Sequence, residues 1–115
     1  MPEDLIFRPI HQLAPLLQKK EISPVELFNE AIERIHQLQP KLNSFITITE
    51  EEGRKAAAEA ESEIRKGQYR GPLHGIPISI KDLFATRGVR TTAGSKILAQ
   101  WIPDYDATAV ARLLD

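Results

Sequence analysis

Cysteine is absent from this sequence of 115 residues. Its absence excludes disulfides and thiolate metal sites, and it leaves the redox compartment undetermined. An excess of either charge is also missing, because 15 Lys and Arg side chains oppose 16 Asp and Glu side chains. The net charge of −1 gives no electrostatic footprint for nucleic acid and no polybasic membrane patch. We therefore expect no direct nucleic-acid partner.

Long apolar runs are missing as well. No stretch approaches the roughly 18 residues that span a bilayer, and the N-terminus MPEDLIFRPI lacks the basic and apolar regions of a secretory signal. What is present is a hydrophobic fraction of 42%, which is ordinary for a globular chain, and a length that suits one domain. These features predict a soluble, cytoplasmic protein without a membrane partner.

Helical periodicity dominates the first forty residues. Leucines at helical spacing predict a short helix over residues 11–19. Ser23, Pro24 and Glu26 form the start signal of a longer helix, because the serine can cap it, the proline suits its first position and the glutamate completes a capping box. We expect Pro40 to end this helix. Its apolar stripe consists of Val25, Phe28, Ile32, Ile35 and Leu38.

Strand and helix signals alternate in the next part of the sequence. Residues 45–49 alternate apolar and polar side chains and predict a strand. Thr49 and Glu52 match a second capping box, which opens a helix that ends before Gly67. Residues 76–80 predict a further strand, so the pattern indicates an α/β fold. The predicted helix buries Ala56, Ala57, Ala60 and Ile64 and carries the exposed pairs Glu51–Lys55 and Glu61–Arg65.

A last helix is predicted near the end of the sequence. Asp106 can cap it, and it bears Val110, Leu113 and Leu114. This helix lacks a Gly, Asn or basic stop signal. The two strands predicted above are also too few to form a stable sheet on their own. We therefore expect the polypeptide to extend beyond Asp115.

Lys81 is the residue with most chemical interest, since it ends the predicted strand 76–80. Apolar residues surround it in sequence, with Ile80 before it and Leu83 and Phe84 shortly after it. Burial among such side chains favours the neutral amine, which can act as a base. The alternative is a surface lysine that pairs with Asp82. The residues alone leave both interpretations open.

Several separated motifs follow in one order along the second half of the sequence. They are Gly75-Ile76-Pro77, Lys81-Asp82, Gly88, Thr91-Thr92-Ala93-Gly94-Ser95, Pro103 and Asp104-Tyr105-Asp106-Ala107-Thr108. In this order and spacing they resemble the amidase signature family, and the resemblance covers essentially all of residues 1–115. It implies an α/β fold with a large mixed sheet flanked by helices. This sequence would be the N-terminal part of a single such domain, with peripheral helices and the strand that carries Lys81.

The resemblance also implies a mechanism, in which carboxylic amides are cleaved by a Ser–cis-Ser–Lys triad. A neutral lysine draws a proton, by way of one serine hydroxyl, from a second serine that attacks the amide carbonyl. Lys81 matches the catalytic lysine of the family. Neither serine role is matched by the five serines present, Ser23, Ser44, Ser62, Ser79 and Ser95. The implied substrate is a small carboxylic amide, with no cofactor and no metal, and this sequence alone is expected to be inactive.

Other candidates are weaker. Ser79 and Lys81 would share one face of a strand, but their separation of roughly 6–7 Å makes a serine–lysine pair a minor hypothesis. Thr91, Thr92 and Ser95 either line or brace the site or form a plain turn that bonds its own backbone. Three histidines, His11, His36 and His74, show no metal-ligand spacing and are interpreted as structural.

A basic turn follows Lys81 in the sequence. It carries Arg87, Arg90 and Lys96, and a solvated loop is favoured there over an anion site.

Three functional hypotheses result. The first is the N-terminal part of a stand-alone amidase, which Leu83 favours because the A subunit of the tRNA-dependent glutamyl/aspartyl amidotransferase commonly has Asn there. The second is that A subunit, which would have partner subunits. The third is a non-catalytic fragment or interaction module, which on its own would aggregate or stay partly disordered. A homodimer is left open.

Overall fold

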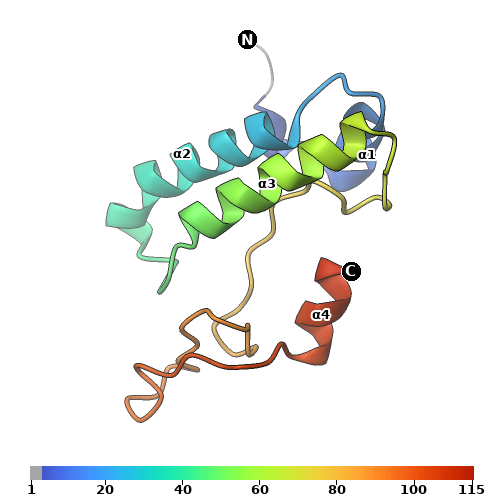
Figure 1. The fold of residues 1–115 in the computed structure, drawn as a ribbon. Coiled ribbons are helices and arrows are strands. Elements are labelled where there is room, and N and C mark those ends of the chain that lie inside the picture. The colour runs from blue at the N-terminus through green and yellow to red at the C-terminus, as the bar shows by residue number, and fades with distance from the viewer. Residues whose placement is uncertain (1–3) are drawn as a thin grey trace. The chain divides into compact units, whose positions relative to one another are not determined.

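The computed structural model describes residues 4–115. The first three residues of MPEDLIFRPI, in which the sequence predicts no secretory signal, lie outside the described part. The chain divides into two units (Figure 1). Unit 1 consists of Met1–Phe45 with Thr49–Pro77, and unit 2 of Ile46–Ile48 with Ile78–Asp115. Among residues 4–115, no helix has both the length and the apolar character needed to cross a bilayer.

Unit 1 is helical. Its elements are the 3-10 helix η1 (Leu5–Phe7) and the α-helices α1 (Ile10–Gln18), α2 (Pro24–Leu42) and α3 (Glu50–Arg65). The predicted helix over 11–19 is thus confirmed with a shift of one residue. Helices α2 and α3 lie side by side and run in opposite directions (Figure 1).

The start of α2 confirms the predicted capping box. The N–H of Glu26 donates to Ser23 Oγ at 3.1 Å, and the N–H of Ser23 donates to Glu26 Oε2 at 3.1 Å. The predicted stop at Pro40 is wrong, because α2 continues to Leu42. A proline in the last turn removes only one helical N–H, and the N–H of Asn43 closes the end on the carbonyl of Gln39 at 2.8 Å.

The predicted strand over 45–49 is not formed. The side-chain amide of Gln39 bonds both backbone groups of Phe45. Its Nε2 donates to the Phe45 carbonyl at 2.7 Å, and its Oε1 accepts from the Phe45 N–H at 3.1 Å. These are the two backbone groups that a neighbouring strand would have to pair. The segment 43–48 therefore forms an irregular connection between α2 and α3.

The start of α3 differs from prediction. Thr49 stands at the N-cap but makes no capping hydrogen bond through its side chain, so the second capping box is wrong. Ala60 and Ile64 are buried as predicted, whereas Ala56 is exposed and Ala57 half-buried. The predicted pair of Glu61 and Arg65 forms, at 3.5 Å.

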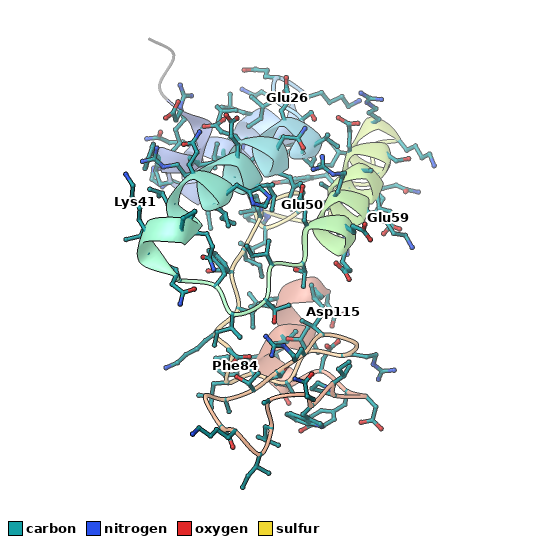
Figure 2. The ribbon with its side chains drawn as sticks, turned by 90° about the vertical axis from the view of Figure 1, so that its left-hand side faces the viewer. Glu26, Lys41, Glu50, Glu59, Phe84 and Asp115 are labelled. Atoms are coloured by element: carbon teal, nitrogen blue, oxygen red, sulfur yellow. The ribbon has the colours of Figure 1, made fainter. Side chains whose placement is uncertain are left out.

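Close approach of α3 to α2 depends on a glycine. A Cβ atom on Gly53 would lie 2.5 Å from Cε2 of Phe28, which is a buried residue of α2. A side chain at this position would therefore require the Phe28 ring to move. Figure 2 labels Glu50 at the start of α3, where its carboxylate contacts His36 of α2 at 2.7 Å and Arg54 at 2.9 Å.

The core of unit 1 is a leucine cluster. Leu13, Leu17 and Leu27 are buried against one another, and Leu17 has no exposed surface. Full burial of such a side chain is worth about 1.5–3 kcal/mol. The half-buried side chains packed against the cluster are Leu5, Ile6, Ile22 and Ile76.

Unit 2 is built from loops and one short helix, α4 (Thr108–Leu114). Residues 85–91, which include a turn closed by the Thr86–Val89 bridge, are joined to residues 101–107 by backbone bonds at widely spaced positions. The N–H of Gly88 donates to the Pro103 carbonyl at 3.0 Å, the N–H of Thr91 donates to the Trp101 carbonyl at 2.9 Å, and the N–H of Ala107 donates to the Ala85 carbonyl at 2.8 Å. Pro103 has no N–H to return a bond, so the pairing does not become a ladder.

The predicted strand over 76–80 is also absent. Within the part of the chain that the structure describes, residues 77–80 form no backbone hydrogen bond and no named strand exists. An extended segment is a strand only when a neighbour pairs with it, and residues 4–115 supply no such neighbour. The mixed sheet is therefore not seen in these residues, although the helical part of the expected fold is.

Asp106 does not cap α4 as predicted. Helix α4 begins after Ala107 without a side-chain cap, and Asp106 Oδ1 instead accepts from the N–H of Arg87 at 2.7 Å. The Asp106 carboxylate thus accepts a tertiary hydrogen bond from Arg87 instead of a local capping bond from α4.

Candidate functional site

Lys81 is exposed in the structure. Its apolar neighbours do not bury it, since Ile78, Leu83 and Phe84 are themselves 45%, 58% and 41% exposed. Figure 2 labels Phe84 on this loop. Of the two interpretations left open, burial of the lysine among apolar side chains is thus not provided by residues 4–115.

Asp82, the next residue, is held by the turn at Thr92. Its Oδ1 accepts from the N–H of Thr92 at 2.9 Å, and its Oδ2 accepts from the Thr92 hydroxyl. The Asp82 carbonyl accepts from the N–H of Ala93 at 2.8 Å. The Thr92 hydroxyl lowers the pKa of Asp82 most, followed by the Thr92 N–H, the charge of Arg90 and the N–H of Gly94. Asp82 therefore pairs with Thr92, and not with Lys81 as the alternative interpretation requires.

The three hydroxyl candidates have different surroundings. Thr92 is 6% exposed and bonds Asp82, ten residues away in sequence. The buried Thr91 donates its hydroxyl to the Val89 carbonyl at 3.1 Å. Ser95 Oγ accepts from the N–H of Ile97 at 3.2 Å. Thr91 and Ser95 thus bond their own turn, and Thr92 braces the segment after Lys81.

The turn that follows Thr92 has a left-handed backbone. Ala93 has φ +50° and Gly94 has φ +69°. This conformation directs the N–H of Ala93 to Asp82 and the N–H of Gly94 to Thr92 Oγ1 at 3.3 Å. Glycine adopts it without cost, whereas the alanine is strained by about 1–2 kcal/mol. The surrounding hydrogen bonds hold it in place.

Among the basic side chains of the turn, Arg90 is an internal brace. Its guanidinium donates to the Ala99 carbonyl at 3.0 Å and to the Ile46 carbonyl at 3.3 Å. It therefore joins three separate stretches of unit 2. The cation is used to satisfy carbonyl groups, which supports the interpretation of this turn as a loop without an anion site.

His74 is the buried histidine of unit 1. Its Nδ1 accepts from the N–H of Arg70 at 3.0 Å, and its Nε2 lies 2.9 Å from Glu63 Oε2. Desolvation lowers the pKa of His74 most, the charge of Arg70 lowers it further, and Glu63 opposes both. Because Nδ1 accepts a hydrogen bond, the ring in its neutral form carries its proton on Nε2, which faces Glu63. Within residues 4–115, no group of three or more His, Cys, Asp or Glu side chains is placed to hold a metal ion.

Ser79, the minor nucleophile candidate, is exposed. The structure shows no hydrogen bond between Ser79 and Lys81 among the described residues, so nothing in it activates this serine. The sequence identified Asp82 as part of a family motif and as a possible charge partner for the lysine, but its contact with Thr92 was missed. The signal for this contact was the Thr-Ala-Gly turn that follows Asp82 by ten residues.

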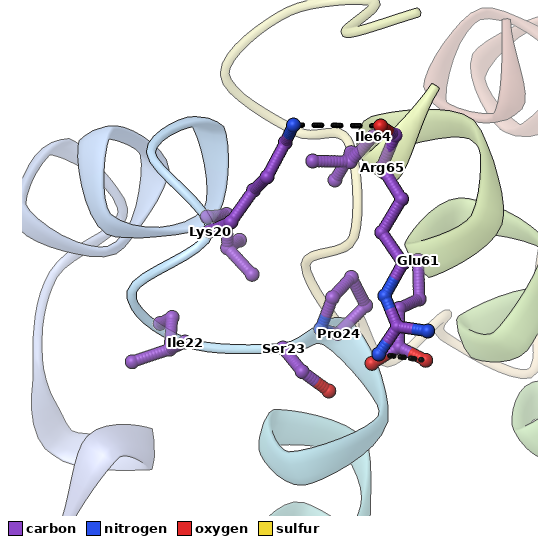
Figure 3. A pocket seen from close by; sticks show the side chains of 8 residues that line it. Lys20, Ile22, Ser23, Pro24, Glu61, Ile64 and Arg65 are labelled. Atoms are coloured by element: carbon purple, nitrogen blue, oxygen red, sulfur yellow. Dashed lines mark hydrogen bonds and ion pairs between the residues drawn. The ribbon is translucent and has the colours of Figure 1, made fainter. Parts of the chain in front are cut away.

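A small hollow occurs on unit 1 (Figure 3). Its volume is about 70 Å³, and it is lined by Leu17, Lys20, Ile22, Ser23, Pro24, Glu61, Ile64 and Arg65. Lys20 Nζ donates across its edge to the Arg65 carbonyl at 3.4 Å. Ligand pockets usually have about 300–1,000 Å³, so this hollow is too small for an organic substrate.

A family model described as "Amidase" matches residues 26–115, and the chain belongs to the amidase family. The match contains Lys81, Asp82 and Thr92.

The chain is similar to curated relatives and to a solved structure. It is 50% identical to the A subunit of the glutamyl-tRNA(Gln) amidotransferase of Geotalea daltonii, over 90% of this chain and 21% of that protein. It is 41% identical to the corresponding protein of Carboxydothermus hydrogenoformans, which has the same name, over 96% of this chain and 23% of that protein. The chain thus spans about a fifth of the length of the curated relatives it matches.

The similar solved structure is described as "An unexpected vestigial protein complex reveals the evolutionary origins of an s-triazine catabolic enzyme". It matches with a TM-score of 0.86 and 29% identity, over 93% of this chain and 24% of that chain. The fold of this chain therefore recurs as a segment of a chain about four times as long.

Proposed function

We propose that this chain supplies the N-terminal part of a single amidase domain and that Lys81 is its general base in the hydrolysis of a small carboxylic amide. The observation that carries the proposal is the family match over residues 26–115, which includes Lys81. The remaining part of such a domain would supply both serines and the rest of the sheet.

The exposure of Lys81 is consistent with this division of labour. A lysine acts as a base only when its surroundings favour the neutral amine, and desolvation has that effect. The apolar side chains beside Lys81, namely Ile78, Leu83 and Phe84, are exposed in this chain. A covering polypeptide that packs on them removes water from the lysine at the same time.

The proposed reaction starts with neutral Lys81. Its Nζ takes a proton, through the hydroxyl of the bridging serine, from the nucleophilic serine. That serine oxygen bonds to the amide carbonyl carbon, and the C–N bond breaks as the nitrogen takes the proton and leaves as ammonia or an amine. Water then cleaves the acyl ester and restores the serine hydroxyl, which balances the reaction without a cofactor.

The test uses a chimera in which this whole chain is fused to the part of the Geotalea daltonii protein that follows its matched segment. Release of ammonia from glutamine and from simple amides is measured. We expect Lys81→Ala to lower kcat/KM by about 100-fold or more, as for loss of a general base. The matched control is Lys41→Ala, an exposed lysine of α2 that Figure 2 labels, with activity unchanged. A folded chimera that is inactive, or full activity of Lys81→Ala, contradicts the proposal.

The amidotransferase is the second candidate, favoured by the names of the relatives at 50% and 41% identity. Against it stands Leu83, which favours the stand-alone amidase. We propose that assembly separates them: if the chimera binds the other subunits of the Geotalea daltonii enzyme and gains glutaminase activity from them, the amidotransferase holds. Activity without assembly favours the stand-alone amidase. The proposal places the protein in the cytoplasm, without direct contact to nucleic acid, and sedimentation of the chimera tests for a homodimer.

A further inference from the structure

A set of hydrogen bonds joins the residue after Lys81 to the turn at Thr92. Both carboxylate oxygens of Asp82 accept from Thr92, Oδ1 from its N–H at 2.9 Å and Oδ2 from its hydroxyl. The Asp82 carbonyl accepts from the N–H of Ala93 at 2.8 Å. The side chain and the backbone of Asp82 are thus held by one turn, and we call this arrangement the Asp82–Thr92 clamp.

The turn is shaped for this contact. The left-handed backbone of Ala93 and Gly94 brings the N–H of Gly94 to Thr92 Oγ1, so the hydroxyl accepts from Gly94 while it donates to Asp82. The Ser95 N–H closes the turn on the Thr92 carbonyl at 2.8 Å. Thr92 is buried, whereas a hydroxyl that only solubilised a loop would be exposed.

The backbone on the other side of Lys81 has no comparable anchor. In the described part of the chain, residues 77–80 make no backbone hydrogen bond. The Lys81 carbonyl accepts from the N–H of Phe84 at 3.0 Å, which is a local turn bond. The clamp is therefore the contact that ties the Lys81 segment to residues distant in sequence.

We propose that Asp82 and Thr92 are positioning residues for Lys81, and that their clamp fixes the backbone from which the base reaches its serine. The inference rests on the proposed function of Lys81. Proton transfer requires heavy atoms within about 2.6–3.2 Å of each other. A displacement of about 1 Å can lower a rate by about 100-fold, so loss of the clamp acts on kcat more than on KM.

The experiment measures kcat and KM of the chimera with substitutions at the clamp. Thr92→Val keeps the shape and removes the hydroxyl, and we expect kcat to fall by about 10–100-fold with KM changed by less than about threefold. Thr92→Ser keeps the hydroxyl and should restore most of kcat. Asp82→Ala should lower kcat as much as Thr92→Val does. The double variant should lower kcat no further than either single variant, because both substitutions break the same clamp.

The control is Thr86→Val, which removes a hydroxyl that bonds the Phe84 carbonyl of its own turn at 3.3 Å. It should leave kcat and KM unchanged. If Thr92→Val fails to fold, Asp82→Asn replaces it, because this variant keeps the size and removes the anionic acceptor. Its kcat should fall by about 3–10-fold at unchanged KM.

The failures are distinguishable. If Lys81→Ala abolishes hydrolysis and Thr92→Val and Asp82→Asn keep the kcat of the parent, the clamp is overturned and the proposed function stands. If Lys81→Ala is fully active, the proposed function fails, whatever the clamp variants show. Equal loss of kcat in Thr92→Ser and Thr92→Val also overturns the clamp, since the serine retains the donor.

Discussion

The two units of the chain are stabilised in different ways. Unit 1 buries leucines from α1 and α2, and α2 begins and ends with local hydrogen bonds. Unit 2 has threonines among its most buried side chains, while Ile97 is 95% exposed. Its other exposed apolar side chains are Ile46, Ile78, Leu83, Phe84, Ile102, Tyr105, Leu113 and Leu114.

This difference indicates what each unit requires. Apolar burial is the main force that stabilises a folded chain, and hydrogen bonds exchanged with water contribute only about 0.5–1.5 kcal/mol each. Unit 1 has a core of its own. Unit 2 has a hydrogen-bonded frame that buries Ala85 and Val110 but leaves most of its large apolar side chains exposed. This arrangement favours the proposal that further polypeptide covers them.

The largest effect is expected from the core of unit 1. Leu17→Ala should destabilise the helical unit by about 2–5 kcal/mol, because a buried leucine is lost and a cavity remains. Thermal or urea unfolding followed by helical circular dichroism measures it. The same substitution at Leu83 of unit 2 should change stability by less than about 0.5 kcal/mol, since this side chain is exposed. Equal losses at the two leucines would contradict the contrast between the units.

A glycine of unit 1 should be nearly as sensitive. Gly75 has φ +83°, and a Cβ atom there would lie 2.8 Å from Cγ of Pro24. Gly75→Ala combines backbone strain with overpacking against a rigid ring, and we expect a loss of about 2–4 kcal/mol. Gly67 is the matched control, because it has φ +82° with open space around it. Gly67→Ala should destabilise the chain only through backbone strain, by about 1 kcal/mol. An equal loss of stability at Gly67 and Gly75 would show that contact with Pro24 contributes nothing.

A smaller effect is expected from pH, with different windows for the two units. Burial lowers the pKa of His74, so the unfolded chain binds a proton first. The contribution of His74 is complete above the ordinary pKa of histidine and is lost as pH falls through the lowered value. Unit 1 should therefore weaken on mild acidification, and His74→Gln should flatten that dependence in unfolding experiments between about pH 7 and 5.

The clamp in unit 2 should respond only to stronger acid. The pKa of Asp82 is lowered, chiefly by the Thr92 hydroxyl, so its contribution is complete above the ordinary pKa of aspartate and is lost as pH falls through the lowered value. In the chimera, exchange of the Thr92 amide hydrogen should stay slow, relative to Asp82→Asn, until that range is reached. If the Thr92 amide loses its protection near neutral pH, in the same range in which unit 1 loses stability, the predicted difference in pH response between the units is wrong.

Sequence reasoning succeeded where the determining contacts are local. Ser23 and Glu26 lie three residues apart, and their capping box formed as predicted. It failed where a distant group competes, as at Asp106, whose carboxylate binds the N–H of Arg87 instead of capping α4. It failed also over residues 76–80, because a strand needs a neighbour that residues 4–115 do not provide.

The candidate site shows the same division. Lys81 was proposed from its motif, and the residues alone left its burial and its exposure both open, because apolar neighbours in sequence bury a residue only if they are themselves covered. The contact of Asp82 with Thr92 could not be predicted either, since the segment between them is irregular and follows no periodic pattern.

The most direct test of the contrast between the units is hydrogen exchange, compared between the chain alone and the chimera. We predict protected amides in α2 and α3 in both samples. We predict that amides of residues 82–107 exchange rapidly in the chain alone and become protected in the chimera, where further polypeptide covers the exposed apolar side chains. Equal protection of residues 82–107 in both samples would show that unit 2 is self-sufficient, and would contradict the claim that it needs the rest of an amidase domain.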